Sequence, residues 1–151
     1  MSSNPVSLWL LKAMLLILGI SALFPGFNLI LDPSGKGVGF PAGALDGSPF
    51  TNYLIPGILL TLCNGLLPLV AWYALWKRPK YAFWARLNPV KTLRWSWTLA
   101  LISGVGLVIW IVVQMTMVPF FFLQPLLLGW GLSIIGLCLM PGVRAVTRIN
   151  L

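Results

Sequence analysis

The chain has 151 residues, of which 59% are hydrophobic and only 8% are charged, and its mean hydropathy is +0.95. A soluble domain carries about 25% charged residues, so this composition excludes an ordinary water-soluble protein and indicates one integral membrane domain covering residues 1–151. The formal net charge is +8. The basic residues border the apolar runs, and the sequence contains no motif that reads nucleic acid. We therefore interpret the charge as a signal of membrane topology and not of nucleic-acid binding.

Four runs of mostly apolar residues are long enough to cross a ~30 Å hydrocarbon core, which takes about 20 residues of helix. They cover about residues 8–31, 52–76, 95–117 and 120–140. Lipid offers backbone groups no hydrogen-bond partners, so these runs are expected to be helical. The sequence therefore predicts an all-α membrane protein, a four-transmembrane-helix bundle made of two hairpins of like orientation. Pro25 is expected to disturb the outer end of the first helix.

The connector between the second and third runs concentrates positive charge. It contains no acid and six bases, namely Lys77, Arg78, Lys80, Arg86, Lys91 and Arg94. By the positive-inside rule this connector is cytoplasmic, and four spans then place both termini on the cytoplasmic side as well. Arg144 and Arg148 in the tail agree with that orientation. The long loop between the first and second runs is therefore expected on the outer face.

This outer loop holds both acidic residues of the chain, Asp32 and Asp46. Each begins a stretch with turn chemistry: Asp-Pro-Ser-Gly fits a type I turn, and Asp-Gly-Ser-Pro is another turn sequence. A catalytic dyad would need the two carboxylates within ~10 Å of each other with a substrate between them, and the sequence indicates nothing of that kind. We therefore interpret both residues as structural turn formers.

At roughly 20 residues the outer loop is longer than a helical hairpin needs. Loops of this kind are often functional, or they fold as compact caps. Four side chains give it apolar groups that are expected to pack down onto the bundle: Phe40, Leu45, Phe50 and Tyr53.

The loop also carries a series of short motifs: D-P-S-G at 32–35, G-x-P at 39–41, L-x-G-S-P-F at 45–50 and Y-L-I-P-G at 53–57. With F-F-F-L-Q-P-L-L-L-G-W-G at 120–131 and M-P-G-V-R at 140–144, they resemble the pattern of small bacterial four-span integral membrane proteins of uncharacterised function. The resemblance covers most of the chain. It implies a four-helix fold in the bacterial cytoplasmic (inner) membrane, and it implies no activity, cofactor or catalytic residue.

The chain lacks the residues that most enzymes and metal sites use. It has no histidine and two cysteines, Cys63 and Cys138, which are far apart in the sequence and form no C-x-x-C motif. Histidine is the usual general base near neutral pH and the commonest metal ligand. We therefore expect no enzyme activity, no cofactor and no metal site.

One functional hypothesis is a structural or accessory component of a membrane complex. Gly129 and Ser133 form a small-xxx-small pair, a pattern typical of close helix contacts in membranes. We expect the third and fourth spans to pack tightly at this face. Alternatively, the face formed by Gly129, Ser133 and Gly136 contacts a partner protein or a second copy of the chain. Membrane lipids are the other expected partners.

The second hypothesis is a binder or carrier of a lipophilic small molecule, in a pocket under the outer loop. Its candidate ligand-binding residues are Asp32, Asp46, Asn52, Tyr53, Gln114 and Gln124. The alternative interpretation is that the glutamines satisfy helix ends and hold the hairpins together. Polar residues deeper in the spans, such as Asn64 and Ser103, are expected to hydrogen-bond across helices.

Overall fold

The computed structural model describes residues 5–41 and 43–149, which form helices joined by loops, with one isolated β-bridge between Leu93 and Arg148. The helices are α1 Pro5–Leu31, η1 Lys36–Val38, α2 Leu54–Leu59, η2 Leu60–Leu66, α3 Leu67–Lys77, α4 Ala82–Leu87, α5 Trp95–Met117, α6 Leu123–Leu139 and α7 Pro141–Thr147. The predicted all-helical class is confirmed for these residues.

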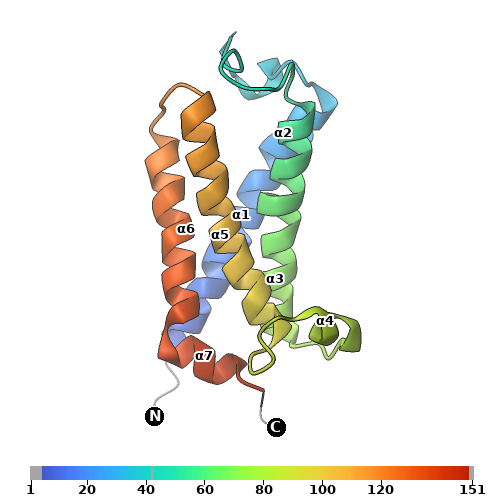
Figure 1. Ribbon diagram of the computed structural model, residues 1–151, viewed down its shortest axis with the longest axis vertical. Coiled ribbons are helices and arrows are strands. Elements are labelled where there is room, and N and C mark those ends of the chain that lie inside the picture. Colours follow the sequence, from blue (N-terminus) through green and yellow to red (C-terminus); the bar gives the residue numbers. More distant parts are fainter. Residues whose placement is uncertain (1–4, 42, 150–151) are drawn as a thin grey trace.

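Three continuous helical stretches are long and apolar enough to cross a membrane: Val6–Leu31, Leu54–Lys77 and Trp95–Met117. A fourth is added if α6 and α7, which are bent by 63° at their junction, count as one span. Figure 1 shows these long helices running up and down beside one another. The loop between α1 and α2 caps one end, which we call the loop end, while α4, α7 and the start of α1 lie at the other, the terminal end.

The first helix ends at Leu31 as predicted, whereas the start of α6 differs from its expected boundary. α1 continues through Pro25 to Leu31, so the proline does not end the helix. α6 begins at Leu123 and not near Phe120, which leaves 17 helical residues, or about 26 Å at ~1.5 Å per residue. The chain then turns sharply at Pro141, which starts α7, because proline fits the first turn of a helix but cannot continue a preceding one.

Glycines bring the helices together in two close pairs. In the first pair, a Cβ on Gly57 of α2 would lie 2.7 Å from Leu29 Cβ of α1, and one on Gly65 of η2 would lie 2.8 Å from Leu23 Cδ2. In the second pair, a Cβ on Gly104 of α5 would lie 3.1 Å from the carbonyl oxygen of Gly131 of α6. Any larger residue at these positions would push the backbones apart.

The prediction that the third and fourth spans meet at Gly129 and Ser133 is wrong about the face. α5 and α6 do pack together, but through Gly104 and Gly131, while Gly129 and Ser133 are exposed. The physical reason is helical periodicity: Gly131 and Ile134 share the inner face of α6, and Gly129, Ser133 and Gly136 lie outside that face. The alternative, that these three contact a partner or a second copy, stays a prediction.

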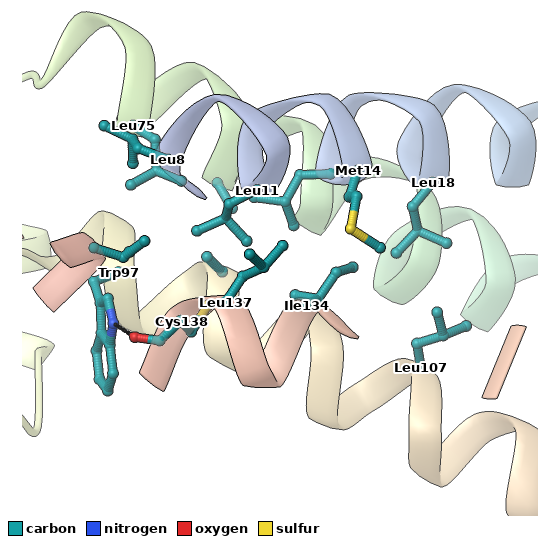
Figure 2. Close-up of a cluster of buried hydrophobic side chains, with 14 of the residues drawn as sticks. Leu8, Leu11, Met14, Leu18, Leu75, Trp97, Leu107, Ile134, Leu137 and Cys138 are labelled. Atoms are coloured by element: carbon teal, nitrogen blue, oxygen red, sulfur yellow. Dashed lines mark hydrogen bonds between the residues drawn. The ribbon is translucent and has the colours of Figure 1, made fainter. Parts of the chain in front are cut away.

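The tightly packed core lies between the pairs in the half of the bundle near the terminal end. Leu11 and Leu15 of α1, Ala71 of α3 and Ile134 of α6 are all fully buried there. Figure 2 shows Leu11 of α1 on one side of this core and Ile134 of α6 on the other. The Trp97 indole N–H donates to the Cys138 carbonyl at 2.8 Å. The Trp130 indole N–H donates to the Met14 carbonyl at 3.2 Å, which ties α6 to α1. Toward the loop end the space between the two pairs is not filled in this way.

The second long helix contains a π-helical segment, η2, over Leu60–Leu66. At its end the Leu67 N–H donates to the Leu62 carbonyl, five residues back, where an α-helix would pair residues four apart. Pro68 supplies the cause, because it has no N–H and its ring clashes with the carbonyl of residue 64. The wider turn accommodates the proline without breaking the helix. Such segments are frequent at functional sites.

Candidate functional site

A cavity of about 460 Å³ lies between the two helix pairs at the loop end. Its volume falls within the range of small-molecule sites, about 300–1,000 Å³. α1 contributes Leu18 and Leu29, α5 contributes Leu107 and Trp110, and α6 contributes Leu127. Its walls are therefore mostly apolar.

The cavity is open to the surroundings of the bundle. Three of its lining residues, Ser21 on α1, Val113 on α5 and Leu123 on α6, are exposed. The edge of the cavity therefore reaches the surface of the bundle.

The loop between α1 and α2 forms the roof of the cavity. The rings of Phe40 and Tyr53 stack with their centroids 4.8 Å apart, and both line the cavity. Leu45 and Phe50 line it as well, so all four apolar side chains expected to pack down do face the bundle interior. The Tyr53 N–H donates to the Pro33 carbonyl at 2.9 Å, which holds the two ends of the loop together.

Asp32 shapes the beginning of this roof. Its carboxylate accepts hydrogen bonds from the Ser34 hydroxyl at 2.6 Å and the Ser34 N–H at 3.1 Å. These bonds favour the ionised form and lower the pKa of Asp32 below its usual value. Gly35 follows with φ 76°, a left-handed conformation that glycine adopts without strain. The interpretation of Asp32 as a turn former agrees with this geometry.

Asn64 is the one residue of η2 whose side chain is both fully buried and directed to the cavity. It is 1% exposed and lines the cavity, yet neither its Oδ1 nor its Nδ2 has a hydrogen-bond partner in the structure. Leaving a buried polar group unpaired costs about 1–3 kcal/mol. An amide bears this cost twice, once as a donor and once as an acceptor. The prediction that Asn64 hydrogen-bonds across helices is therefore wrong, and Ser103 bonds within its own helix, to the Leu99 carbonyl.

The six candidate residues fall into three groups. Tyr53 and Gln114 line the cavity. Asp32, Asp46 and Asn52 are exposed and do not line it, and the Asn52 Oδ1 accepts from the Leu54 N–H at the start of α2 instead. Gln124 is fully buried outside the lining, where its Oε1 accepts from the Phe121 N–H at 3.3 Å and its Nε2 has no partner.

Asn64 is a cavity residue that the sequence interpretation did not include among the candidate site residues. Its signal was its position: it is an amide deep in an apolar span, followed by Gly65 and, four residues on, by Pro68. A proline at that spacing disturbs the hydrogen bonding around Asn64 and predicts a local widening of the helix.

The lining of this cavity is mostly apolar, and it is uncharged. Among the described residues, the only ionisable side chain that lines it is Tyr53, and burial raises the pKa of that phenol, so the lining is uncharged at neutral pH. Within residues 5–41 and 43–149, no group of three or more His, Cys, Asp or Glu is placed to hold a metal ion. The other polar side chains of the lining carry hydroxyl, amide or indole groups, which can form hydrogen bonds: Ser21, Ser48, Asn64, Gln114 and Trp110.

Comparison with known proteins gives no match: neither a protein-family model, nor a curated protein, nor a solved structure matches this chain.

Proposed function

We propose that this protein is a non-catalytic integral membrane protein that binds or carries a lipophilic small molecule in the cavity beneath the outer loop. Four spans, the last of them at about residues 120–140, set it in the bacterial inner membrane. The basic connector between α3 and α5 and both termini lie on the cytoplasmic side, and the loop between α1 and α2 lies outside.

The unpaired carboxamide of Asn64 in an apolar cavity carries this proposal. An apolar cavity with few polar groups is what a lipophilic ligand needs, and one buried amide gives its polar group a donor and an acceptor. Gln114 lines the same cavity and offers a second amide. The ligand therefore has an apolar body and at least one uncharged group that both donates and accepts hydrogen bonds.

The cavity favours this function over a purely structural role. A protein that only braces a complex gains nothing from an unfilled interior, since well-packed interiors leave few voids. The same chain packs its other half densely around Leu11 and Ile134. The core around Leu11 and Ile134 therefore shows that the helix pairs of this chain can pack without such an opening.

The test is native mass spectrometry of the protein extracted from its membrane in mild detergent. Wild type is expected to retain one small-molecule adduct of defined mass, and Asn64→Leu and Gln114→Leu are expected to lose most of it. Gln124→Leu is the matched control, because it removes an equally buried amide outside the cavity and is expected to keep the adduct. No adduct on the wild type, or an equal loss in all three variants, contradicts the proposal.

A further inference from the structure

A second cavity, of about 560 Å³, lies at the terminal end of the bundle. It is formed where the end of α3, the connector with α4, the start of α5 and the residues after α7 meet. It shares no lining residue with the cavity under the loop. Nothing in the proposed function uses it.

Five cationic side chains line this second cavity: Arg78, Lys80, Lys91, Arg94 and Arg148. Because the only two acidic side chains of the chain, Asp32 and Asp46, are in the loop at the opposite end, no carboxylate side chain neutralises these bases. Five like charges around one hollow repel one another. A bound anion would remove that repulsion.

Arg94 has a hydrogen-bonding group that is not satisfied. It lines the cavity, and its Nε is buried without a hydrogen-bond partner in the structure. It also precedes Trp95, the first residue of the 23-residue helix α5. Trp95 and Ser96 line the cavity too, so the positive end of the α5 dipole lies at its wall.

The walls of this cavity are held in place. Asn88 is buried, and its Nδ2 donates to the Val90 and Leu93 carbonyls at 2.8 and 2.7 Å, while its Oδ1 accepts from the Thr98 hydroxyl at 2.6 Å. The Trp95 indole N–H donates to the Pro79 carbonyl at 3.3 Å. These bonds fix the connector against α5, so the basic side chains are anchored on an ordered frame.

We propose that this cavity binds a phosphate-bearing anion. A tetrahedral phosphate offers several acceptor oxygens to the guanidinium and ammonium groups that line the cavity, which is the recognition that arginine forks and helix N-termini provide. The same chemistry is presented by the headgroup of an anionic phospholipid and by a small soluble phosphate ester. Both sources are tested separately.

The first arm uses the full-length protein in nanodiscs of phosphatidylcholine containing a minor fraction of phosphatidylglycerol. Native mass spectrometry after release from the disc is expected to find one retained phosphatidylglycerol per protein. The second arm titrates the protein in neutral detergent with glycerol 3-phosphate and with inorganic phosphate, by calorimetry. Saturable one-to-one binding in either arm supports the proposal, and which arm shows it identifies the source.

The double variant Arg78→Gln with Arg94→Gln is expected to weaken the binding about tenfold or more, since each lost charge-assisted bond is a substantial part of such an interaction. Arg86→Gln with Arg144→Gln is the control, because it removes the same charge from exposed bases outside the cavity and is expected to change the affinity little. Lys80→Gln, a single change at an exposed cavity residue, serves if the double variant does not fold. Binding on the wild type that does not saturate, or that falls equally in pocket and control variants, overturns the proposal.

Discussion

The rings of Phe40 and Tyr53 stack with centroids 4.8 Å apart and planes 20° apart, directly over the cavity. Phe40 comes from the middle of the loop and Tyr53 from the residue before α2, so their contact fastens the loop across the top of the helix pairs. An aromatic pair of this kind contributes about 0.5–1.5 kcal/mol beyond its buried area. The roof is thus held by a contact that can be changed without touching the helices.

Tyr53→Ala is expected to loosen the roof and speed the release of a bound lipophilic molecule, while leaving the helical bundle intact. The measurement is the dissociation rate of the native adduct after dilution into ligand-free detergent, with circular dichroism as the check on the fold. Tyr53→Phe keeps the ring and should release at the wild-type rate. If Tyr53→Ala also releases at the wild-type rate, the stack does not retain the ligand.

Asn64→Leu is expected to affect stability and binding in opposite directions. Leucine has the same number of side-chain heavy atoms in the same branched shape, its added bulk can extend into the cavity, and it removes two buried polar atoms that have no partner. The ligand-free protein should therefore become more stable by about 1–3 kcal/mol, while ligand retention falls. Thermal unfolding in detergent, after the ligand has been stripped, measures the first effect. A loss of stability instead would mean that the carboxamide has a structural role.

Alanine substitutions at the buried Gly131 and at the exposed Gly129 of α6 are expected to change stability in different ways. A Cβ at Gly131 would lie 2.9 Å from Val108 Cγ2 and 3.1 Å from the Gly104 carbonyl oxygen, so Gly131→Ala should cost about 1–3 kcal/mol by forcing α5 and α6 apart. A methyl group added at Gly129 would have nothing within 4 Å, so Gly129→Ala should be neutral or stabilise the helix by up to about 1 kcal/mol.

Midpoints of thermal unfolding for these two variants, measured in the same detergent, provide the comparison. Equal destabilisation by both alanines would show that α6 uses its outer face for intramolecular packing, against the contacts described here.

The turn at Asp32 is expected to weaken in acid. Its pKa is lowered in the folded state by the hydrogen bonds from Ser34, so the ionised carboxylate stabilises the turn above the unfolded value of about 3.9. That contribution is lost as the pH falls through the lower, folded pKa. Amide hydrogen exchange at Ser34, corrected for the intrinsic pH dependence, should therefore accelerate at the acid end of a titration from about pH 6 to about pH 2.

Asp32→Asn is the control for this titration, since an amide oxygen still accepts hydrogen bonds but does not titrate in this range. Its corrected exchange rate at Ser34 should not change with pH. The same acid-dependent acceleration in the variant would assign the effect to another group.

Several features of the fold could be predicted from the sequence, because apolar length is a strong signal in membranes. The runs at about 52–76 and 95–117 correspond closely to Leu54–Lys77 and to α5. The loop aromatics and Gln114 also lie at one site, since all were expected at the outer ends of spans. These inferences need only the position of each residue along its helix.

What the sequence did not provide was the direction in which side chains face. To predict that Gly131 and not Gly129 contacts α5, one must know how α6 is rotated about its own axis. A helix that is apolar on all sides has little hydrophobic periodicity from which this rotation could be inferred. Asn64 was predicted to form hydrogen bonds to another helix. The sequence pattern does not show that a cavity separates Asn64 from the α5–α6 pair, so this prediction could not have been corrected from the sequence alone. Asp46 and Asn52 were included among the candidate site residues because they lie in the loop or next to it in the sequence, but both are exposed in the structure.

Photo-crosslinking in native membranes tests most directly the proposal that the cavity under the loop between α1 and α2 holds one kind of lipophilic molecule. p-Benzoylphenylalanine in place of Tyr53 puts the reactive group at the cavity roof, and in place of the exposed Tyr73 of α3 it puts the group at the bundle surface. After irradiation and intact-mass measurement, the account predicts one adduct of a single defined mass at position 53 and a mixture of bulk phospholipids at position 73. The same phospholipid mixture at both positions would contradict it.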